Sequence, residues 1–253
     1  MAARFLAPLG AIFAAFLAVL LLLWPGAAMA CDEPDAARRV TALYGERIAF
    51  DVLRNGRPVG EAVTEFRRAG ALLEVHSRMT LDIRVLFVPF YRFSYDSRAQ
   101  WCGDRLAALA ARVDDNGTAF ALDARASDGA LLVDSDAGRL RAPAALLPTD
   151  HWNTAVLDDD AVLNTLTGRI NAVRIVPCAE PSPLVMATAP TARCHAYTGE
   201  LEAEVYHDAD GRWVGLAFAG RDGSDIVYRC RDCAAAAPTR AARDDADAAD
   251  NDG

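Results

Sequence analysis

The segment from Met79 to Trp101 reads MTLDIRVLFVPFYRFSYDSRAQW, and it alternates apolar and polar residues over almost its whole length. Successive side chains of a strand point to opposite faces, so this period of two predicts strands that bury one face of a sheet. Each strand residue advances the chain by about 3.3 Å, which makes the segment too long for one strand of a small domain. Because proline cannot donate a ladder hydrogen bond, we expect the chain to turn back near Pro89 as a hairpin. The odd, apolar face comprises Met79, Leu81, Ile83, Val85, Phe87, Tyr91, Phe93, Tyr95, Ala99 and Trp101.

The same pattern continues on both sides of this segment. Asn55-Gly56 and Asn116-Gly117 are typical of tight hairpin turns, and short alternating runs extend to Tyr228. Helix punctuation appears in the stretch from Pro148 to Gly168, where Thr149 and the aspartates at 158–160 can cap two turns. The fold class predicted is mostly β: a large curled antiparallel sheet of about ten strands, forming a half-open or closed barrel, with this short helical segment covering it.

The two ends differ from the body of the chain. Residues 1–30 contain an apolar run after a single arginine and end in Ala-Met-Ala, which predicts a cleaved signal peptide and a periplasmic or secreted protein. The alternatives are an uncleaved membrane anchor and lipid attachment at Cys31, although Ala28 stands where bacterial lipoproteins usually carry leucine. We expect a lead-in over residues 31–44, a single β domain over 45–232, and a disordered acidic tail over 233–253.

Charge limits the classes of partner. The net charge is −9, and all 26 basic residues are arginine. Nucleic-acid binding proteins present a basic surface, and anionic lipid attracts clusters of basic residues. We therefore expect no nucleic-acid partner and no strong binding to a membrane surface.

Six cysteines in an exported chain predict disulfide bonds. Cys178 and Cys194 bracket a proline-rich loop between two strand-like runs, and we expect them to be bonded to each other. Cys230 and Cys233 should also be oxidised, either together or with Cys31 and Cys102. No helix follows the Cys-x-x-Cys pair to lower a thiol pKa, so a structural role is favoured over a redox role.

Motifs of catalysis, of nucleotide binding and of metal binding are absent from the sequence, so we expect no cofactor and no metal. His195 and His207 share the parity of one predicted strand, which would separate them by about 40 Å and prevent them from sharing an ion unless the strand is broken. Asp150-His151 is the pair that could serve a hydrolase, but capping and packing explain it more simply and are favoured.

Several motifs together resemble an uncharacterised family of exported bacterial proteins, a domain of unknown function. They are IAFDVLRNGRPVG, the aromatic strand pair, W-x-G-x-x-L from Trp101 to Leu106, TDHWN, LNTLTG, YHDADGRWVGLAF and DGSDIVYR, and they cover roughly residues 45–230. At greater distance the pattern is similar to the periplasmic lipoprotein-localisation factors. That second resemblance implies a half-open barrel whose helical lid covers an apolar cavity for acyl chains.

These observations favour a periplasmic binding or carrier protein for an apolar ligand, including lipid-like molecules, over an enzyme. The alternatives are a hydrolase that uses the Asp150/His151 region and a structural envelope protein. For the aromatic cluster itself, a filled core is favoured over a ligand wall, since aromatic residues dominate cores generally. If a cavity is present, its candidate ligand-binding residues are Phe87, Phe90, Tyr91, Phe93, Tyr95 and Trp101.

Overall fold

The computed structural model describes Cys31 and residues 34–233. The predicted signal peptide, and the predicted acidic tail beyond Cys233, lie outside the described residues. Internal contacts divide the chain into two units after Asp32, and everything below concerns the second. Among the described residues, no helix has the length and apolar character needed to cross a membrane.

The described residues form one large antiparallel sheet, as predicted, but with fifteen strands. The strands are β1 (Arg47–Arg54), β2 (Arg57–Ala69), β3 (Leu72–Val85), β4 (Val88–Cys102), β5 (Arg105–Asp115), β6 (Thr118–Ser127), β7 (Ala130–Ser135), β8 (Gly138–Pro143), β9 (Leu147–Pro148), β10 (Ala161–Leu163), β11 (Ile170–Pro177), β12 (Arg193–Gly199), β13 (Ala203–His207), β14 (Trp213–Ala219) and β15 (Asp225–Asp232). The helices are α2 (Pro34–Tyr44), the 3₁₀-helix η2 (Thr154–Asp158) and α3 (Pro183–Met186).

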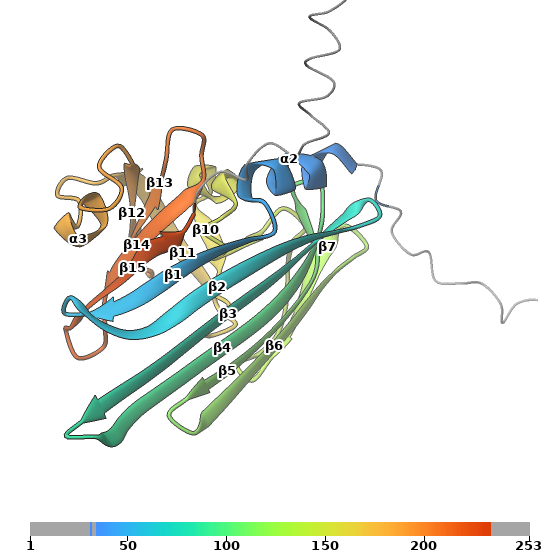
Figure 1. Ribbon diagram of the computed structural model, residues 1–253. Coiled ribbons are helices and arrows are strands. Elements are labelled where there is room, and N and C mark those ends of the chain that lie inside the picture. Colours follow the sequence, from blue (N-terminus) through green and yellow to red (C-terminus); the bar gives the residue numbers. More distant parts are fainter. Residues whose placement is uncertain (1–30, 32–33, 234–253) are drawn as a thin grey trace, which may run out of the picture. The chain divides into compact units, whose positions relative to one another are not determined.

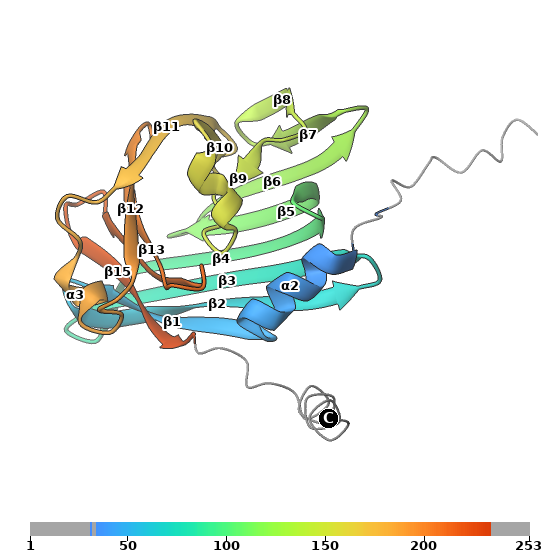
Figure 2. The ribbon, with the colours of Figure 1, turned by 90° about the horizontal axis from the view of Figure 1, so that it is seen from above.

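The strand order is β8-β7-β6-β5-β4-β3-β2-β1-β15-β14-β13-β12-β11-β10-β9. The two chain ends of the sheet therefore meet in its middle, where β1 pairs with both β2 and β15. Strands β8 and β9 form the edges, so the sheet curls without closing (Figures 1 and 2). All neighbours are antiparallel except β9 and β10, which are parallel. The sheet has more strands than the predicted number of about ten, because several strands are short and because the run predicted from Tyr197 to Tyr206 is two strands.

The odd face of the 79–101 segment is the inner face, as its pattern predicts. Strands β3 and β4 pair so that Met79 lies opposite Tyr95 and Leu81 lies opposite Phe93. The chain turns at Leu86-Phe87, earlier than we expected, and the backbone of Pro89 lies within β4 beside an irregularity in the pairing. The prediction of a hairpin is therefore right, and the predicted position of its turn is wrong by two residues.

One end of the curl is filled by aromatic side chains. Trp101 stacks edge-on against Trp152 at 5.2 Å between ring centroids, and Phe66 lies 5.5 Å from Trp152. Helix α2 packs on this end of β2, β3 and β4 (Figure 2). From that helix the Tyr44 hydroxyl donates to the Trp152 carbonyl (2.8 Å) and accepts from the Trp213 backbone N–H (2.9 Å). This end is a packed core.

The stretch from Pro148 to Gly168 lies inside the curl, but little of it is helical. Asn153 caps η2 as its side chain accepts from the Ala155 N–H. The second turn of helix predicted after Asp160 is wrong, because that part forms β10 and pairs with β9 and β11. Gly168 has a φ of +68° and lies so close to Ser135 and Phe120 that a side chain would clash. Its glycine is required by this close approach and not by a helix end.

Two disulfides are placed within the sheet. Cys178 is bonded to Cys194, which is the pairing predicted from the sequence, and Cys230 is bonded to Cys233. No cysteine among the described residues is free, Cys31 and Cys102 included. The Cys-x-x-Cys pair continues the end of β15, where Phe50 of β1 lies opposite Cys230. No described helix begins there, which fits the structural role that we expected.

Candidate functional site

The curl contains an apolar cavity of about 540 Å³, and Trp152 of the core described above is one of its lining residues. One wall is supplied by the inner faces of β3 and β4, through Met79, Leu81, Ile83, Tyr91, Phe93 and Tyr95. The facing wall comes from β13, β14 and β15, through Ala203, Leu216, Phe218, Ile226 and Tyr228. Binding cavities for small molecules in proteins measure about 300–1,000 Å³ and are mostly apolar. This cavity has the size and lining of a ligand site.

The predicted ligand-binding residues divide into two groups. Phe90, Tyr91, Phe93 and Tyr95 line the cavity. Trp101 does not, since it is 1% exposed in the aromatic core. Phe87 does not either, since it is 94% exposed at the tip of the β3–β4 hairpin. The alternation predicts the correct face for Trp101, but it cannot say how far along that face the core ends and the cavity begins.

The mouth of the cavity is the exposed part of its lining that contains Phe90, Arg221 and Asp222; the other exposed lining residues include Arg78, Leu166 and Glu202. Here Arg221, in the turn between β14 and β15, forms an ion pair with Asp115 at the end of β5 (3.0 Å). The Tyr91 hydroxyl donates to the other oxygen of Asp115 (2.8 Å). Tyr91 is a cavity residue, so Asp115 connects the ion pair to the apolar wall through a hydrogen bond.

The floor of the cavity is formed by the segment inside the curl, and it is polar. It consists of Thr149, Asp150, His151, Trp152 and Thr165. The Tyr95 hydroxyl donates to Thr165 Oγ1 (3.0 Å), which joins the floor to the β4 wall. Two floor residues have strongly shifted pKa values. Burial raises the pKa of Asp150 to about 7, with the Trp152 side chain opposing part of the rise. Burial and the neighbouring His207 lower the pKa of His151 to about 3.

Asp150 and His151 both reach the cavity but do not pair with each other. Among the described residues, no hydrogen bond or ion pair joins their side chains, and His151 Nδ1 has no partner. The His151 ring packs against Tyr197 and Trp213, at 5.9 and 5.6 Å between centroids. A neutral imidazole held between two aromatic rings is arranged for packing. The described residues place no serine or cysteine within hydrogen-bonding distance of it.

The expectation that His195 and His207 are far apart is wrong. The predicted strand breaks at Gly199, whose φ is +113°, and β12 and β13 form a hairpin that brings the two rings to 5.8 Å. His207 Nε2 donates to the His151 carbonyl (2.9 Å). Within residues 34–233, the one set of three ligand atoms within 4.8 Å of one another is that of Cys178, Cys194 and Glu204. Both of its sulfurs are in a disulfide, so it is not a metal site.

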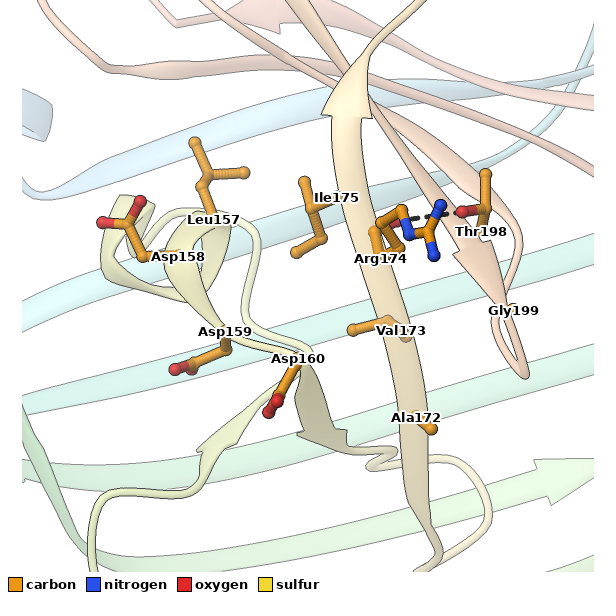
Figure 3. Close-up of a pocket in the computed structure, with 10 residues that line it drawn as sticks. All are labelled: Leu157, Asp158, Asp159, Asp160, Ala172, Val173, Arg174, Ile175, Thr198 and Gly199. Carbon is orange, nitrogen blue, oxygen red and sulfur yellow. Dashed lines mark hydrogen bonds between the residues drawn. The ribbon is translucent and has the colours of Figure 1, made fainter.

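A second depression, of about 600 Å³, lies on the surface beside η2 and β11 (Figure 3). Three consecutive aspartates, 158–160, line one side of it, and residues 172–175 of β11 line the other. Figure 3 shows Asp158 pointing away from Asp159 and Asp160. Because these carboxylates do not converge, the depression offers less to a ligand than the enclosed cavity does.

A family model described as a domain of unknown function, DUF6134, matches residues 50–231. The chain belongs to the DUF6134 family. The uncharacterised family that the sequence motifs suggested is thereby confirmed. A search of curated proteins found no match to this DUF6134 chain.

A solved structure resembles the DUF6134 domain in fold. It is the crystal structure of a beta-barrel-like protein of domain of unknown function DUF1849 from Brucella abortus. The TM-score is 0.50 at 13% sequence identity, over 75% of this chain and 97% of the other. At that identity the likeness concerns the fold alone, and it supports a barrel-like architecture for the DUF6134 domain.

Sequence reasoning overlooked half of this DUF6134 cavity. The wall from β13–β15 mixes small and medium apolar side chains such as Ala203 and Leu216 with aromatic residues that are spread over separate strands, so no run of aromatic residues in the sequence marks it. The alternation of Leu201, Ala203 and Val205 with three glutamates was the available signal. That alternation identifies a dry face without indicating what the face surrounds.

Proposed function

We propose that the protein binds or carries an apolar, lipid-like ligand in the cavity between β3–β4 and β13–β15, outside the cytoplasm. The observation that carries this proposal is the cavity itself, about 540 Å³ of mostly apolar space inside a curled sheet. Binding of an apolar molecule in a buried apolar space of this size is favourable, because the molecule replaces poorly hydrogen-bonded water or empty volume. The two disulfides support a location in an oxidising compartment.

The proposed role is binding rather than catalysis. No described serine or cysteine forms a hydrogen bond with His151, and the walls offer shape and apolar contact. A carrier needs a mouth that can open, and the ion pair between Arg221 and Asp115 is exposed enough to break and form again. The molecules that stay bound to the protein during purification would identify its physiological ligand.

The experiment has two parts. Native mass spectrometry of protein purified from its own host should reveal a bound apolar molecule. In vitro, the neutral fluorophore N-phenyl-1-naphthylamine should bind and brighten. Ala203→Trp, on the cavity wall, should weaken the binding of the fluorophore at least tenfold by filling the space.

Ala110→Trp is the matched control, since Ala110 is on the outer face of β5, opposite Arg98 and Asp123. It should leave binding unchanged. If the protein carries no ligand and the fluorophore does not brighten, or if both variants reduce its binding equally, the proposal is wrong.

A further inference from the structure

The cavity floor contains one carboxyl group without a partner. Asp150 lines the cavity and is 8% exposed. Among the described residues, no arginine forms an ion pair with it. The Trp152 side chain is near enough to lower its pKa, but Trp152 Nε1 makes no well-formed hydrogen bond. A buried carboxylate is costly unless an opposite charge or several donors compensate for it. The folded chain supplies neither.

The basic groups around the cavity are all engaged elsewhere. Arg221 pairs with Asp115, and Arg54 pairs with Asp222 at 2.5 Å. The remaining arginine of the lining, Arg78, pairs with Glu65 at 3.0 Å. His151 is adjacent to Asp150 in the chain, but burial lowers its pKa to about 3, so it is neutral near pH 7. No described cation is therefore left to balance Asp150.

We propose that the ligand bears a basic nitrogen at one end, which docks on Asp150 while its apolar body lies between the β3–β4 and β13–β15 walls. This inference rests on the proposed function and specifies the ligand class. A protonated amine would donate hydrogen bonds to the carboxylate and supply the missing charge. The hydroxyl oxygens of Thr149 and Thr165 lie on the same floor and can accept hydrogen bonds from its remaining N–H groups.

The reverse orientation, with an anionic head group on the floor, is disfavoured by the same residues. A fatty-acid carboxylate placed beside Asp150 would bring two like charges together in a space of low dielectric. The Tyr95 hydroxyl already donates to Thr165 and so does not offer that anion a free donor. The protein should therefore bind a cationic amphiphile more tightly than an anionic amphiphile of equal chain length.

The test uses decylamine and decanoate, each competing with N-phenyl-1-naphthylamine at pH 8 and below its micelle concentration. In the full chain, decylamine should compete at least tenfold more effectively than decanoate. Asp150→Asn should weaken the binding of decylamine about tenfold, and the binding of decanoate should stay equal or become tighter. Asp123→Asn is the control, because that carboxylate is exposed on the outer face of β6, is already paired with Arg112 at 2.9 Å and does not line the cavity. It should change neither ligand by more than about twofold.

The outcomes are distinguishable. If the fluorophore and both amphiphiles bind, but Asp150→Asn affects the amine and the acid alike or affects neither, the head-group inference is overturned and the proposed function stands. If decanoate is the tighter ligand of the unaltered chain, the inference is likewise overturned. If the fluorophore does not bind at all, the proposed function itself fails. Thermal melts of each variant confirm that the protein under test is folded.

Discussion

Arg221 and Asp115 are 106 residues apart in the sequence, and their side chains meet at 3.0 Å beside the mouth of the cavity. Asp115 ends β5, while Arg221 is in the turn between β14 and β15, six strands away in the order of the sheet. The arginine side chain is 93% exposed. The contact therefore joins two distant parts of the curled sheet at the point where a ligand would enter.

Arg221→Ala should speed both the entry and the release of N-phenyl-1-naphthylamine several-fold, with little change in its Kd. Exposed ion pairs contribute about 0–1 kcal/mol to stability, so Tm should hardly change. Raising the salt concentration should accelerate exchange in the unaltered protein, since salt screens exposed charges. Stopped-flow fluorescence measures both rates.

Arg139→Ala is the control for this prediction, because Arg139 forms an exposed ion pair with Asp134 at 2.9 Å in the β7–β8 hairpin, and neither residue lines the cavity. The role of Arg221 at the mouth is contradicted if both variants alter the exchange rates to the same degree.

Asp150 should make the free energy of unfolding fall as pH rises. The pKa of its carboxyl is raised from 3.8 to about 7 in the folded chain, so the folded state holds a proton that the unfolded state releases. Its contribution to stability is complete below about pH 4 and is lost as pH rises through about 7. At about 1.4 kcal/mol per pKa unit, the loss between pH 5 and pH 8 is about 3 kcal/mol.

Asp150→Asn removes this titration. The variant should therefore gain about 3 kcal/mol relative to the unaltered protein between pH 5 and pH 8, in urea unfolding without ligand. His151 has a lowered pKa and changes stability in the opposite direction, but it is present in both proteins and cancels in the difference. A difference that does not vary with pH would show that Asp150 is ionised in the folded chain throughout.

Phe93 and Arg92 test the assignment of the inner face. Phe93 lines the cavity, whereas its neighbour Arg92 is exposed on the outer face. Phe93→Asn should cost about 2–4 kcal/mol by removing apolar contacts and adding a polar group, and it should weaken the fluorophore. Arg92→Asn should change stability by about 0.5 kcal/mol or less. Equal effects in thermal melts and titrations would mean that the inner face is assigned wrongly.

Replacing Leu86 and Phe87 at the tip of the β3–β4 hairpin with residues that favour turns should stabilise the protein. Leu86 and Phe87 have φ values of +49° and +70°, close to the +49° and +74° of Asn55 and Gly56 in the β1–β2 turn. Residues with a large side chain are disfavoured by about 1–2 kcal/mol in this region, and two positive φ values favour Asn-Gly. Replacing Leu86-Phe87 by Asn-Gly should raise the free energy of unfolding by about 1–2 kcal/mol.

Urea unfolding measures that gain, and the reverse exchange at Asn55-Gly56 should produce a larger loss, because Asn55 Oδ1 also accepts from the Asp225 N–H (2.9 Å). The two side chains are 88% and 94% exposed, so their removal takes away no packing. A substituted turn that is less stable would mean that Leu86 or Phe87 contacts the rest of the folded chain in solution.

Much of the fold follows from local pattern. The alternation around Leu81 and Phe93 predicts their shared inner face, and Asn55-Gly56 marks its hairpin correctly, because each depends on neighbours along one strand or turn. The turn at Leu86-Phe87 carries no turn signature at all. Its position is decided by the pairing of β3 with β4, which a short window of sequence does not contain.

The site follows less well because it is made of distant parts. Asp150 stands out in the sequence as the neighbour of His151, which suggests catalysis. Its place on a cavity floor depends on how the segment from Pro148 to Gly168 crosses the inside of the sheet. Similarly, Gly199 breaks a run that otherwise alternates well enough to be predicted as a single strand from Tyr197 to Tyr206.

The pairing of β1 with β15 has a consequence for how the chain matures. Asp51 of β1 forms an ion pair with Arg229 of β15 at 3.0 Å, and 178 residues of sequence separate them. One edge of β1 therefore stays open until almost the whole chain has been synthesised, and such non-local pairing slows folding. An open edge invites pairing with other chains. The interior is completed by the last strand to appear, so a guest molecule can be enclosed only after synthesis has reached β15.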